Sequence, residues 1–162
     1  MIRYSSEVSI ARAPHDVFAA LLDPERYAQW TPMTDMVFEG SGPPRIGQRG
    51  SFRLAEGPIK GRLEMEIVEL DTDRRIVFRV THPALDWKAV NTIQPDGAGS
   101  RLTYAGEMSL RGWRRLLEPV MGGEIRNGEA KEALRLKELL EAELEAEPTA
   151  ASDAAATSRA TA

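Results

Sequence analysis

The chain has 162 residues, of which 42% are hydrophobic and 28% charged, and its formal net charge is −4. This size and composition fit one globular domain with a substantial core, while the acidic balance and the lack of a dense Lys/Arg cluster argue against nucleic-acid binding. The sequence contains no cysteine, which excludes disulfides and thiolate catalysis, and with only two histidines we expect no metal and no other cofactor.

The first predicted element is a strand over residues 3–11. Ser5, Glu7 and Ser9 are expected to face solvent. The residues that alternate with them form the predicted inner face: Tyr4, Ser6, Val8 and Ile10. A period of two is typical of a half-buried strand.

Two short helices are expected next. Pro14 suits the first turn of a helix, and apolar residues at helical spacing extend this helix to Leu22. Pro24 interrupts it, because proline disfavours α geometry in the residue before it, and then opens a second helix. This second helix ends near Trp30, and we expect Tyr27 and Trp30 to pack it on the sheet rather than to contact a ligand.

Six further strands are expected along the chain. Turns rich in glycine, proline and aspartate separate runs in which apolar side chains alternate with polar ones. Because parallel neighbours need long crossover connections, these short turns predict antiparallel pairing. The expected strands cover residues 35–40, 48–54, 60–70, 76–80, 87–93 and 102–108.

A long helix from Trp113 to about residue 145 is expected to cover the apolar face of the sheet. At 1.5 Å per residue it would be roughly 45 Å long, and Trp113 is expected to anchor its start. Its predicted apolar stripe consists of Ile125, Ala133, Leu136, Leu140 and Leu144.

The segment VMGGEIRNG places Gly122, Gly123 and Gly128 inside this helix, although each interior glycine costs a helix about 1 kcal/mol relative to alanine. Two interpretations are open. The small residues either leave space between the helix and the sheet for a ligand, or the Gly122-Gly123 pair breaks or bends the helix. A break would not exclude the space.

The end of the chain from Pro148 reads PTAASDAAATSRATA and contains no large apolar side chain. We therefore expect one folded domain over residues 1–147 and a disordered tail over residues 148–162. No apolar run approaches the ~20 residues needed to cross a bilayer, and the first residues lack the features of a secretory signal. We expect a cytoplasmic protein with no membrane span.

The order of the elements and several phrases of the sequence resemble the START-like (SRPBCC) superfamily, and within it the polyketide cyclase/dehydrase and lipid-transport family. The resemblance covers residues 3 to about 145 and rests on APHDVFAALLDPERYAQW, EIVELDTDRRIVFRV, IQPDGAGSRLTYAGEM and GWRRLLEPV. It implies an α+β helix-grip fold, in which a curved seven-stranded antiparallel sheet wraps a long C-terminal helix, with two short helices between strands one and two. It also implies a cavity between sheet and helix that binds lipids, polyketides or other apolar molecules.

The candidate ligand-binding residues are those expected to face this cavity. Asn91 is the most informative, because a buried amide without hydrogen bonds costs about 1 to 3 kcal/mol. It bonds either a ligand or a neighbouring side chain or water. Tyr4 and Tyr104 either donate to a ligand or point their hydroxyls to solvent at the rim. The full set is Tyr4, Ser6, Met65, Phe78, Trp87, Asn91, Tyr104, Met108, Met121 and Ile125.

No catalytic residue is assigned from the sequence. His82 and Asp86 occupy one loop and form a possible proton-transfer pair, but an exposed histidine without a partner is the commoner case. Glu64 and Glu66 alternate with apolar residues and are expected on the solvated face of the sheet. The one basic cluster is interpreted as a solvated helix start rather than a phosphate site: Arg111, Arg114 and Arg115.

Three functions are compatible with these features. The first is a carrier or sensor that binds an apolar small molecule without catalysis, which is favoured by the scarcity of titratable groups on the inner faces. The second is an aromatase/cyclase-type enzyme that acts on a polyketide-like substrate mainly by positioning it. The third is an interaction module that resembles the chaperone-ATPase activators of the superfamily, for which we expect a contiguous exposed apolar patch.

Overall fold

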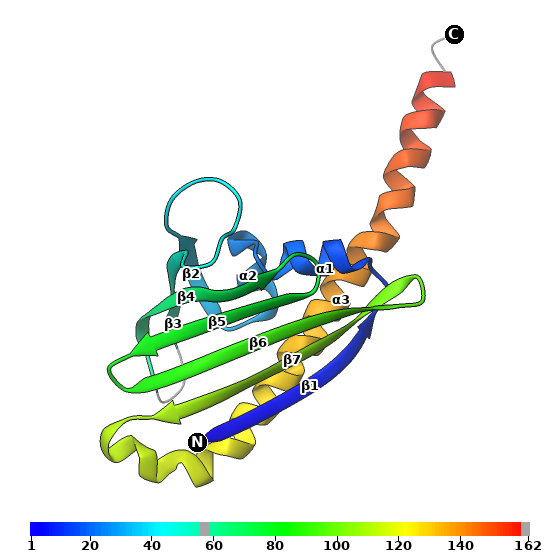
Figure 1. Cartoon of the computed structure of the whole chain (residues 1–162). Coiled ribbons are helices and arrows are strands. Elements are labelled where there is room, and N and C mark those ends of the chain that lie inside the picture. The colour runs from blue at the N-terminus through cyan, green and yellow to red at the C-terminus, as the bar shows by residue number, and fades with distance from the viewer. Residues whose placement is uncertain (56–58, 160–162) are drawn as a thin grey trace.

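The computed structural model describes the backbone of residues 1–55 and 59–159, and within these ranges the side chains as far as residue 146. One strand, two short helices, six strands and a C-terminal helical segment follow one another along the chain (Figure 1). The elements are β1 Ile2–Ile10, α1 Pro14–Ala20, α2 Pro24–Trp30, β2 Met33–Phe38, β3 Arg49–Leu54, β4 Gly61–Asp71, β5 Arg75–His82, β6 Leu85–Asp96, β7 Gly99–Leu110, the 3-10 helix η1 Gly112–Leu117 and α3 Glu118–Arg159.

The seven strands form one antiparallel sheet in the order β1-β7-β6-β5-β4-β3-β2. Strands that follow one another in sequence pair with each other from β2 to β7, while β1 pairs with β7. The curved sheet lies over α3, which crosses it from η1 towards α1 and α2 (Figure 1). This architecture confirms the predicted helix-grip fold of the α+β class.

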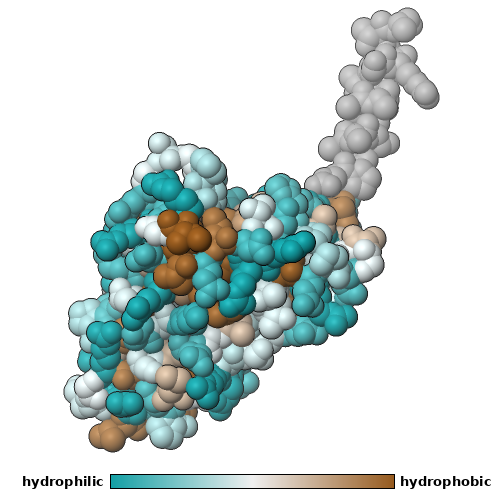
Figure 2. All heavy atoms as spheres, in the orientation of Figure 1, coloured by the Kyte–Doolittle hydropathy of each residue, from teal (hydrophilic) through white to brown (hydrophobic). Residues whose placement is uncertain are grey.

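Side-chain burial follows the predicted period of two most clearly in β1, β4 and β6, whereas three consecutive residues are buried in β3 and in β5. In β4, Leu63, Met65 and Ile67 are buried on the inner face, while Arg62 and Glu64 are exposed. The face of the sheet turned away from α3 is mostly hydrophilic, with a few apolar patches (Figure 2). The predicted inner face of this strand is therefore confirmed, and with it the solvated position of Glu64.

Two register shifts interrupt the regular pairing of the sheet. One lies between Thr34 and Val37 in the β2–β3 pair, where Asp35 has a positive φ of 51°, and the other lies between Ile67 and Glu69 in the β4–β5 pair. Bulges of this kind increase the local twist and bend the strand. They suit a sheet that curves around a helix.

The two short helices begin at the prolines that predicted them. In α2 the Asp23 carboxylate Oδ1 accepts a hydrogen bond from the Glu25 backbone N at 3.0 Å, which caps the helix N-terminus. The rings of Tyr27 and Trp30 lie 4.8 Å apart, and both residues are buried in the core, so their predicted packing role is confirmed. The first helix, α1, ends at Ala20, two residues earlier than expected.

The start of the C-terminal helical segment differs from the prediction. Residues 112–117 form η1, and α3 begins at Glu118, whose carboxylate Oε1 accepts a hydrogen bond from Leu110 N at 2.8 Å. Gly122 and Gly123 lie inside the continuous α3, so the interpretation that this pair breaks the helix is wrong. Packing of the remaining helix offsets the low helical propensity of two glycines. Trp113 is 67% exposed and does not anchor the segment in the core.

The part of α3 after Glu132 packs into the core. Ala133, Leu136 and Leu140 are completely buried, as the predicted stripe requires, whereas Leu144 is 40% exposed. The backbone of α3 continues to Arg159. The domain boundary at residue 147 and the disordered tail over residues 148–162 remain predictions, since the structure describes no side chain there.

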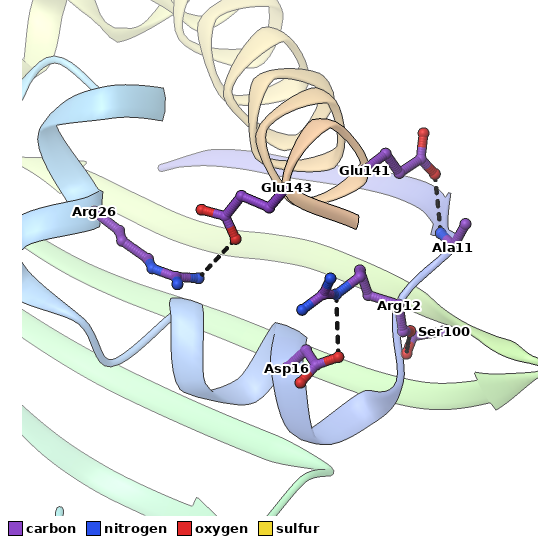
Figure 3. A network of polar contacts seen from close by, with 7 residues as sticks. All are labelled: Ala11, Arg12, Asp16, Arg26, Ser100, Glu141 and Glu143. Carbon is purple, nitrogen blue, oxygen red and sulfur yellow. Dashed lines mark hydrogen bonds and ion pairs between the residues drawn. The ribbon is translucent and has the colours of Figure 1, made fainter. Parts of the chain in front are cut away.

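Polar contacts hold the same part of α3 against the start of the chain (Figure 3). Arg26 Nη1 of α2 lies 3.3 Å from Glu143 Oε2, and the backbone N of Ala11 donates to Glu141 Oε1 at 2.9 Å. Lys137 Nζ donates to the carbonyl oxygen of Ser9 at 2.8 Å. The C-terminal half of α3 is thus fixed by both apolar packing and directed contacts.

Candidate functional site

A hollow of about 480 Å³ lies between the first half of α3 and the strands that face it. Its walls come from β6, β7, the end of β3, α3 and the segments that precede β2 and β4, so segments far apart in sequence meet there. The lining is mainly apolar, as is usual for a small-molecule site. It consists of Pro32, Leu54, Ile59, Leu85, Trp87, Met108, Leu110, Met121, Glu124, Ile125, Gly128, Glu129 and Glu132.

Two glutamates of α3 are buried at this hollow. Glu129 is 8% exposed and Glu132 is 7% exposed, and their spacing of three residues places them on one helix face. Burial raises the pKa of Glu129 to about 7. Burial, together with the neighbouring charge of Glu129, raises the pKa of Glu132 to about 8. At neutral pH the pair therefore retains protons that exposed carboxyls have lost.

Aromatic side chains from three strands lie close to these carboxyls. Tyr104 Oη of β7 donates to Glu132 Oε2 at 3.4 Å, and Trp87 Nε1 of β6 donates to Tyr4 Oη of β1 at 2.9 Å. The ring centroids of Tyr4 and Tyr104 are 6.0 Å apart. Burial raises the pKa of both tyrosine hydroxyls well above the ordinary value, so they remain neutral hydrogen-bond donors. Neither hydroxyl lies at a solvent-exposed rim.

A smaller void of about 20 Å³ shares Trp87 with the hollow. Its volume has room for about one water molecule. The void is lined by Tyr27, Met33, Met36, Phe52, Met65, Phe78, Val80, Trp87, Ala89, Asn91 and Tyr104.

Three buried side-chain atoms have no hydrogen-bond partner among the residues that the structure describes: Trp30 Nε1, Asn91 Oδ1 and Glu129 Oε2. An unpaired buried polar atom costs about 1 to 3 kcal/mol. Asn91 lines the small void and Glu129 lines the hollow, so each unpaired acceptor belongs to a residue that borders a space. A ligand or a water molecule in these spaces can supply the missing donors.

The predicted ligand-binding residues divide according to the space that they line. Four residues line the hollow: Trp87, Met108, Met121 and Ile125. Five line the small void: Met65, Phe78, Trp87, Asn91 and Tyr104. The remaining two line neither space: Tyr4 is buried with its hydroxyl bonded to Trp87, and Ser6 is half-buried on β1.

The sequence prediction missed the glutamate pair, and the expected scarcity of titratable groups on the inner faces is wrong. Glu129 lies four residues after Ile125 and four before Ala133, which places it inside the predicted apolar stripe. A carboxyl at such a position was the signal available in the sequence. Charged side chains are almost never fully buried without partners, so this position needs a functional or structural explanation.

The glycines of the VMGGEIRNG segment have different surroundings. A Cβ built on Gly123 or Gly128 meets open space, whereas a Cβ on Gly122 lies 3.3 Å from Arg126 Nη1. Of these three glycines only Gly128 lines the hollow. Gly128 is therefore the one of these three glycines whose missing side chain adds space to the hollow.

The other titratable candidates lie outside the hollow. Asp86 Oδ2 accepts from Arg79 Nη2 at 3.1 Å, and His82 Nδ1 accepts from the backbone N of Ala84 at 3.1 Å. Both side chains thus have structural partners. Among the described residues, no group of three His, Asp or Glu side chains is arranged to hold a metal ion, and no described helix is long and apolar enough to cross a membrane.

Three solved structures with a similar fold each align with most of this chain. TTHA0849 from Thermus thermophilus is 17% identical with a TM-score of 0.71, and the alignment covers 86% of this chain and 97% of that chain. DynU16, a putative protein in the dynemicin biosynthetic locus, is 18% identical with a TM-score of 0.65 over 87% of this chain and 48% of that chain. The Aha1 dimer from Colwellia psychrerythraea is 14% identical with a TM-score of 0.63, and the alignment covers 86% of this chain and 96% of that chain. At these identities the similarity shows the fold alone.

The sequence comparison is more specific than the structural one. No curated protein sequence matches the chain. The family model described as polyketide cyclase / dehydrase and lipid transport, however, matches residues 1–141, which include every residue that lines the hollow and the small void. The chain therefore belongs to the polyketide cyclase/dehydrase and lipid-transport family.

Proposed function

We propose that this protein binds an apolar small molecule, as a carrier or sensor, in the hollow between the first half of α3 and the sheet. The observation that supports this function best is the hollow itself, whose volume of about 480 Å³ and mainly apolar lining are typical of small-molecule sites. Met108, Met121 and Ile125 provide adaptable apolar contacts on opposite walls. The apolar walls supply affinity, and the few polar groups orient the ligand.

A second candidate function is acid–base catalysis of the aromatase/cyclase type. It is favoured by Glu129 and Glu132, because burial brings the pKa values of both carboxyls close to neutrality. Such a pair contains a base that is partly ionised at neutral pH beside an acid that is partly protonated. Tyr104, which donates to Glu132, is suited to orient a substrate oxygen or the acid itself.

Native mass spectrometry of protein purified without detergent tests the binding function. We expect a retained apolar molecule, and a rise in melting temperature when apolar ligands are added. Leucine at Gly128 fills part of the hollow, so Gly128→Leu is expected to lose both effects. Gly123→Leu is the matched control, since Gly123 is also an α3 glycine with open space at its Cβ but does not line the hollow. Absence of any adduct and of any ligand-induced stabilisation would contradict the proposal.

The catalytic candidate is tested once a substrate of the bound class is identified. Glu129→Gln and Glu132→Gln remove the ionisable groups but keep the side-chain volume, and Tyr104→Phe removes the donor. We expect these variants to lose turnover and to retain binding of the apolar body of the substrate. Full turnover in all three variants would exclude the carboxyl pair from catalysis.

A further inference from the structure

We propose that the ligand of the hollow is a hydrophobic amine, whose ammonium group binds between Glu129 and Glu132 while its apolar body fills the space along α3. This inference rests on the proposed binding function and adds the chemical class of the ligand. It excludes fatty acids and other hydrophobic anions as the preferred occupants.

The first argument is the charge of the lining. Three of its residues carry ionisable side chains, Glu124, Glu129 and Glu132, and all three are acidic. No lysine, arginine or histidine belongs to the described lining. In a site of low dielectric, like charges repel and opposite charges attract much more strongly than in water. A carboxylate head group is therefore disfavoured in this hollow, and a cationic head group is favoured.

The second argument is the unpaired oxygen of Glu129. Its Oε2 atom is buried and has no hydrogen-bond partner among the described residues, and the residue as a whole is 8% exposed. Glu132 Oε2 has one long contact, the 3.4 Å hydrogen bond from Tyr104. An ammonium group has three N–H donors and no acceptor. It matches a site in which one buried carboxyl oxygen, Glu129 Oε2, lacks a donor.

The third argument is the aromatic surroundings of the two carboxyls. Trp87 lines the hollow together with Glu129 and Glu132, and Tyr104 contacts Glu132. The face of an aromatic ring attracts a cation that lies over it. The lining of the hollow thus places one aromatic side chain, Trp87, in the same space as the carboxyl pair that binds the proposed ammonium group.

Protonation of the carboxyls opposes the binding of an amine. The groups that influence the pair come from several elements: Tyr4 of β1, Tyr27 of α2, Tyr104 of β7 and Arg135 of α3. The tyrosines are neutral and Arg135 is exposed, so no buried cation among the described residues neutralises the pair. Binding of an ammonium group must therefore release protons from Glu129 and Glu132. We expect amine affinity to increase as the pH rises from about 6 to about 8.

A series of ligands with one alkyl chain and different head groups tests the proposal. Octylamine, octan-1-ol and octanoate are compared by isothermal titration calorimetry at about pH 8, below their micelle concentrations. We expect octylamine to bind at least about tenfold more tightly than octan-1-ol, and octanoate to bind most weakly. Octyltrimethylammonium carries the charge without N–H donors, and is expected to bind more weakly than octylamine because it cannot donate to the carboxyl oxygens.

Three variants locate the preference in the carboxyl pair. Glu129→Gln and Glu132→Gln are expected to reduce octylamine binding to the level of octan-1-ol, without loss of octan-1-ol binding. Glu138→Gln changes an exposed carboxyl of α3 outside the hollow and is expected to leave the preference intact.

The outcomes separate this inference from the function on which it rests. If octan-1-ol or octanoate binds as tightly as octylamine to the unmodified protein, the amine proposal is wrong and the apolar binding function stands. If no member of the series binds, and no adduct is retained on purification, both are wrong. The comparison on the unmodified protein decides the question even if a glutamine variant fails to fold.

Discussion

The two halves of α3 belong to one continuous helix but meet different surroundings. Between Glu118 and Glu132 the helix borders the hollow and contains three glycines, together with the two buried carboxyls that line the hollow, Glu129 and Glu132. After Glu132 the inward positions Ala133, Leu136 and Leu140 are completely buried, and ion pairs and hydrogen bonds tie the helix to the start of the chain. The second half is thus built for stability, and this stability allows the first half to hold residues that are unfavourable in a helix or a core.

The largest effect is expected in the tightly packed half. Leu136→Ala removes a completely buried side chain and leaves a cavity, so the free energy of unfolding should fall by about 2 to 5 kcal/mol in chemical denaturation. Leu134→Ala is the matched control, because Leu134 is 49% exposed on the same helix and its loss should change stability much less. Equal effects of the two substitutions would remove the basis of the comparison.

The next effect concerns the carboxyls of the other half. Because the pKa values of Glu129 and Glu132 are raised from 4.5 to about 7 and about 8, the folded state binds more protons than the unfolded state in this range. The free energy of unfolding should therefore be greatest near pH 4.5 and fall by a few kcal/mol as the pH rises to about 8. Three carboxyls with lowered pKa, Glu69, Glu118 and Glu141, contribute in the opposite sense and at lower pH.

Denaturation curves at several pH values measure this decline. The double variant Glu129→Gln/Glu132→Gln should show a much flatter dependence on pH, whereas Glu138→Gln should behave as the unmodified protein. A decline of the same size in the double variant would mean that other groups cause it.

Alanine at the two open glycines should produce a smaller effect of opposite sign. Gly123→Ala and Gly128→Ala place a methyl group in open space within α3, and should each raise the free energy of unfolding by roughly 0.5 to 1 kcal/mol. Only Gly128→Ala narrows the hollow, so it alone should weaken ligand binding. If both variants are more stable and Gly128→Ala binds the ligand as well as the unmodified protein does, Gly128 has no role in the site.

The smallest effect is expected at the surface contact between Arg26 and Glu143. Both side chains are about one-third exposed, at 34% and 33%, and their closest atoms are 3.3 Å apart. Exposed ion pairs of this kind contribute about 0.2 to 1 kcal/mol. Glu143→Gln removes this contact without removing the second ion pair of Arg26, with Asp23, and should lower the melting temperature only slightly, by a difference that decreases further at high salt. A loss as large as that of Leu136→Ala would show that this contact, rather than the apolar packing, fixes the second half of α3.

Most of the fold was predictable because its elements carry strong periodic signals. The alternation of Leu63, Met65 and Ile67 with charged residues identified a half-buried strand and its inner face. Pro14 and Pro24 identified the helix starts. The sequence left open whether Gly122-Gly123 breaks the helix, because local propensity alone does not include the packing that holds the continuous α3 together.

The site was less predictable than the fold. Apolar candidates such as Met108, Met121 and Ile125 follow from the inner faces of strands and the helix stripe, and they do line the hollow. Glu129 and Glu132 were missed, since a glutamate in a helix is normally interpreted as a solvated residue. Tyr4 and Ser6 share the alternation of β1, yet both line neither space.

The sequence by itself determined most of the elements, their antiparallel pairing and the apolar faces, because periods of two and 3.6 residues and the lengths of turns are properties of the local chain. Only the tertiary structure decided that Glu129 and Glu132 are buried beside a hollow and that Tyr104 reaches Glu132. The physical reason is that the burial of a helix position depends on which distant segments cover it. Here β6, β7 and the segments before β2 and β4 cover the first half of α3. They bury its two carboxyls, which raises their pKa values, beside the hollow in which we propose their role.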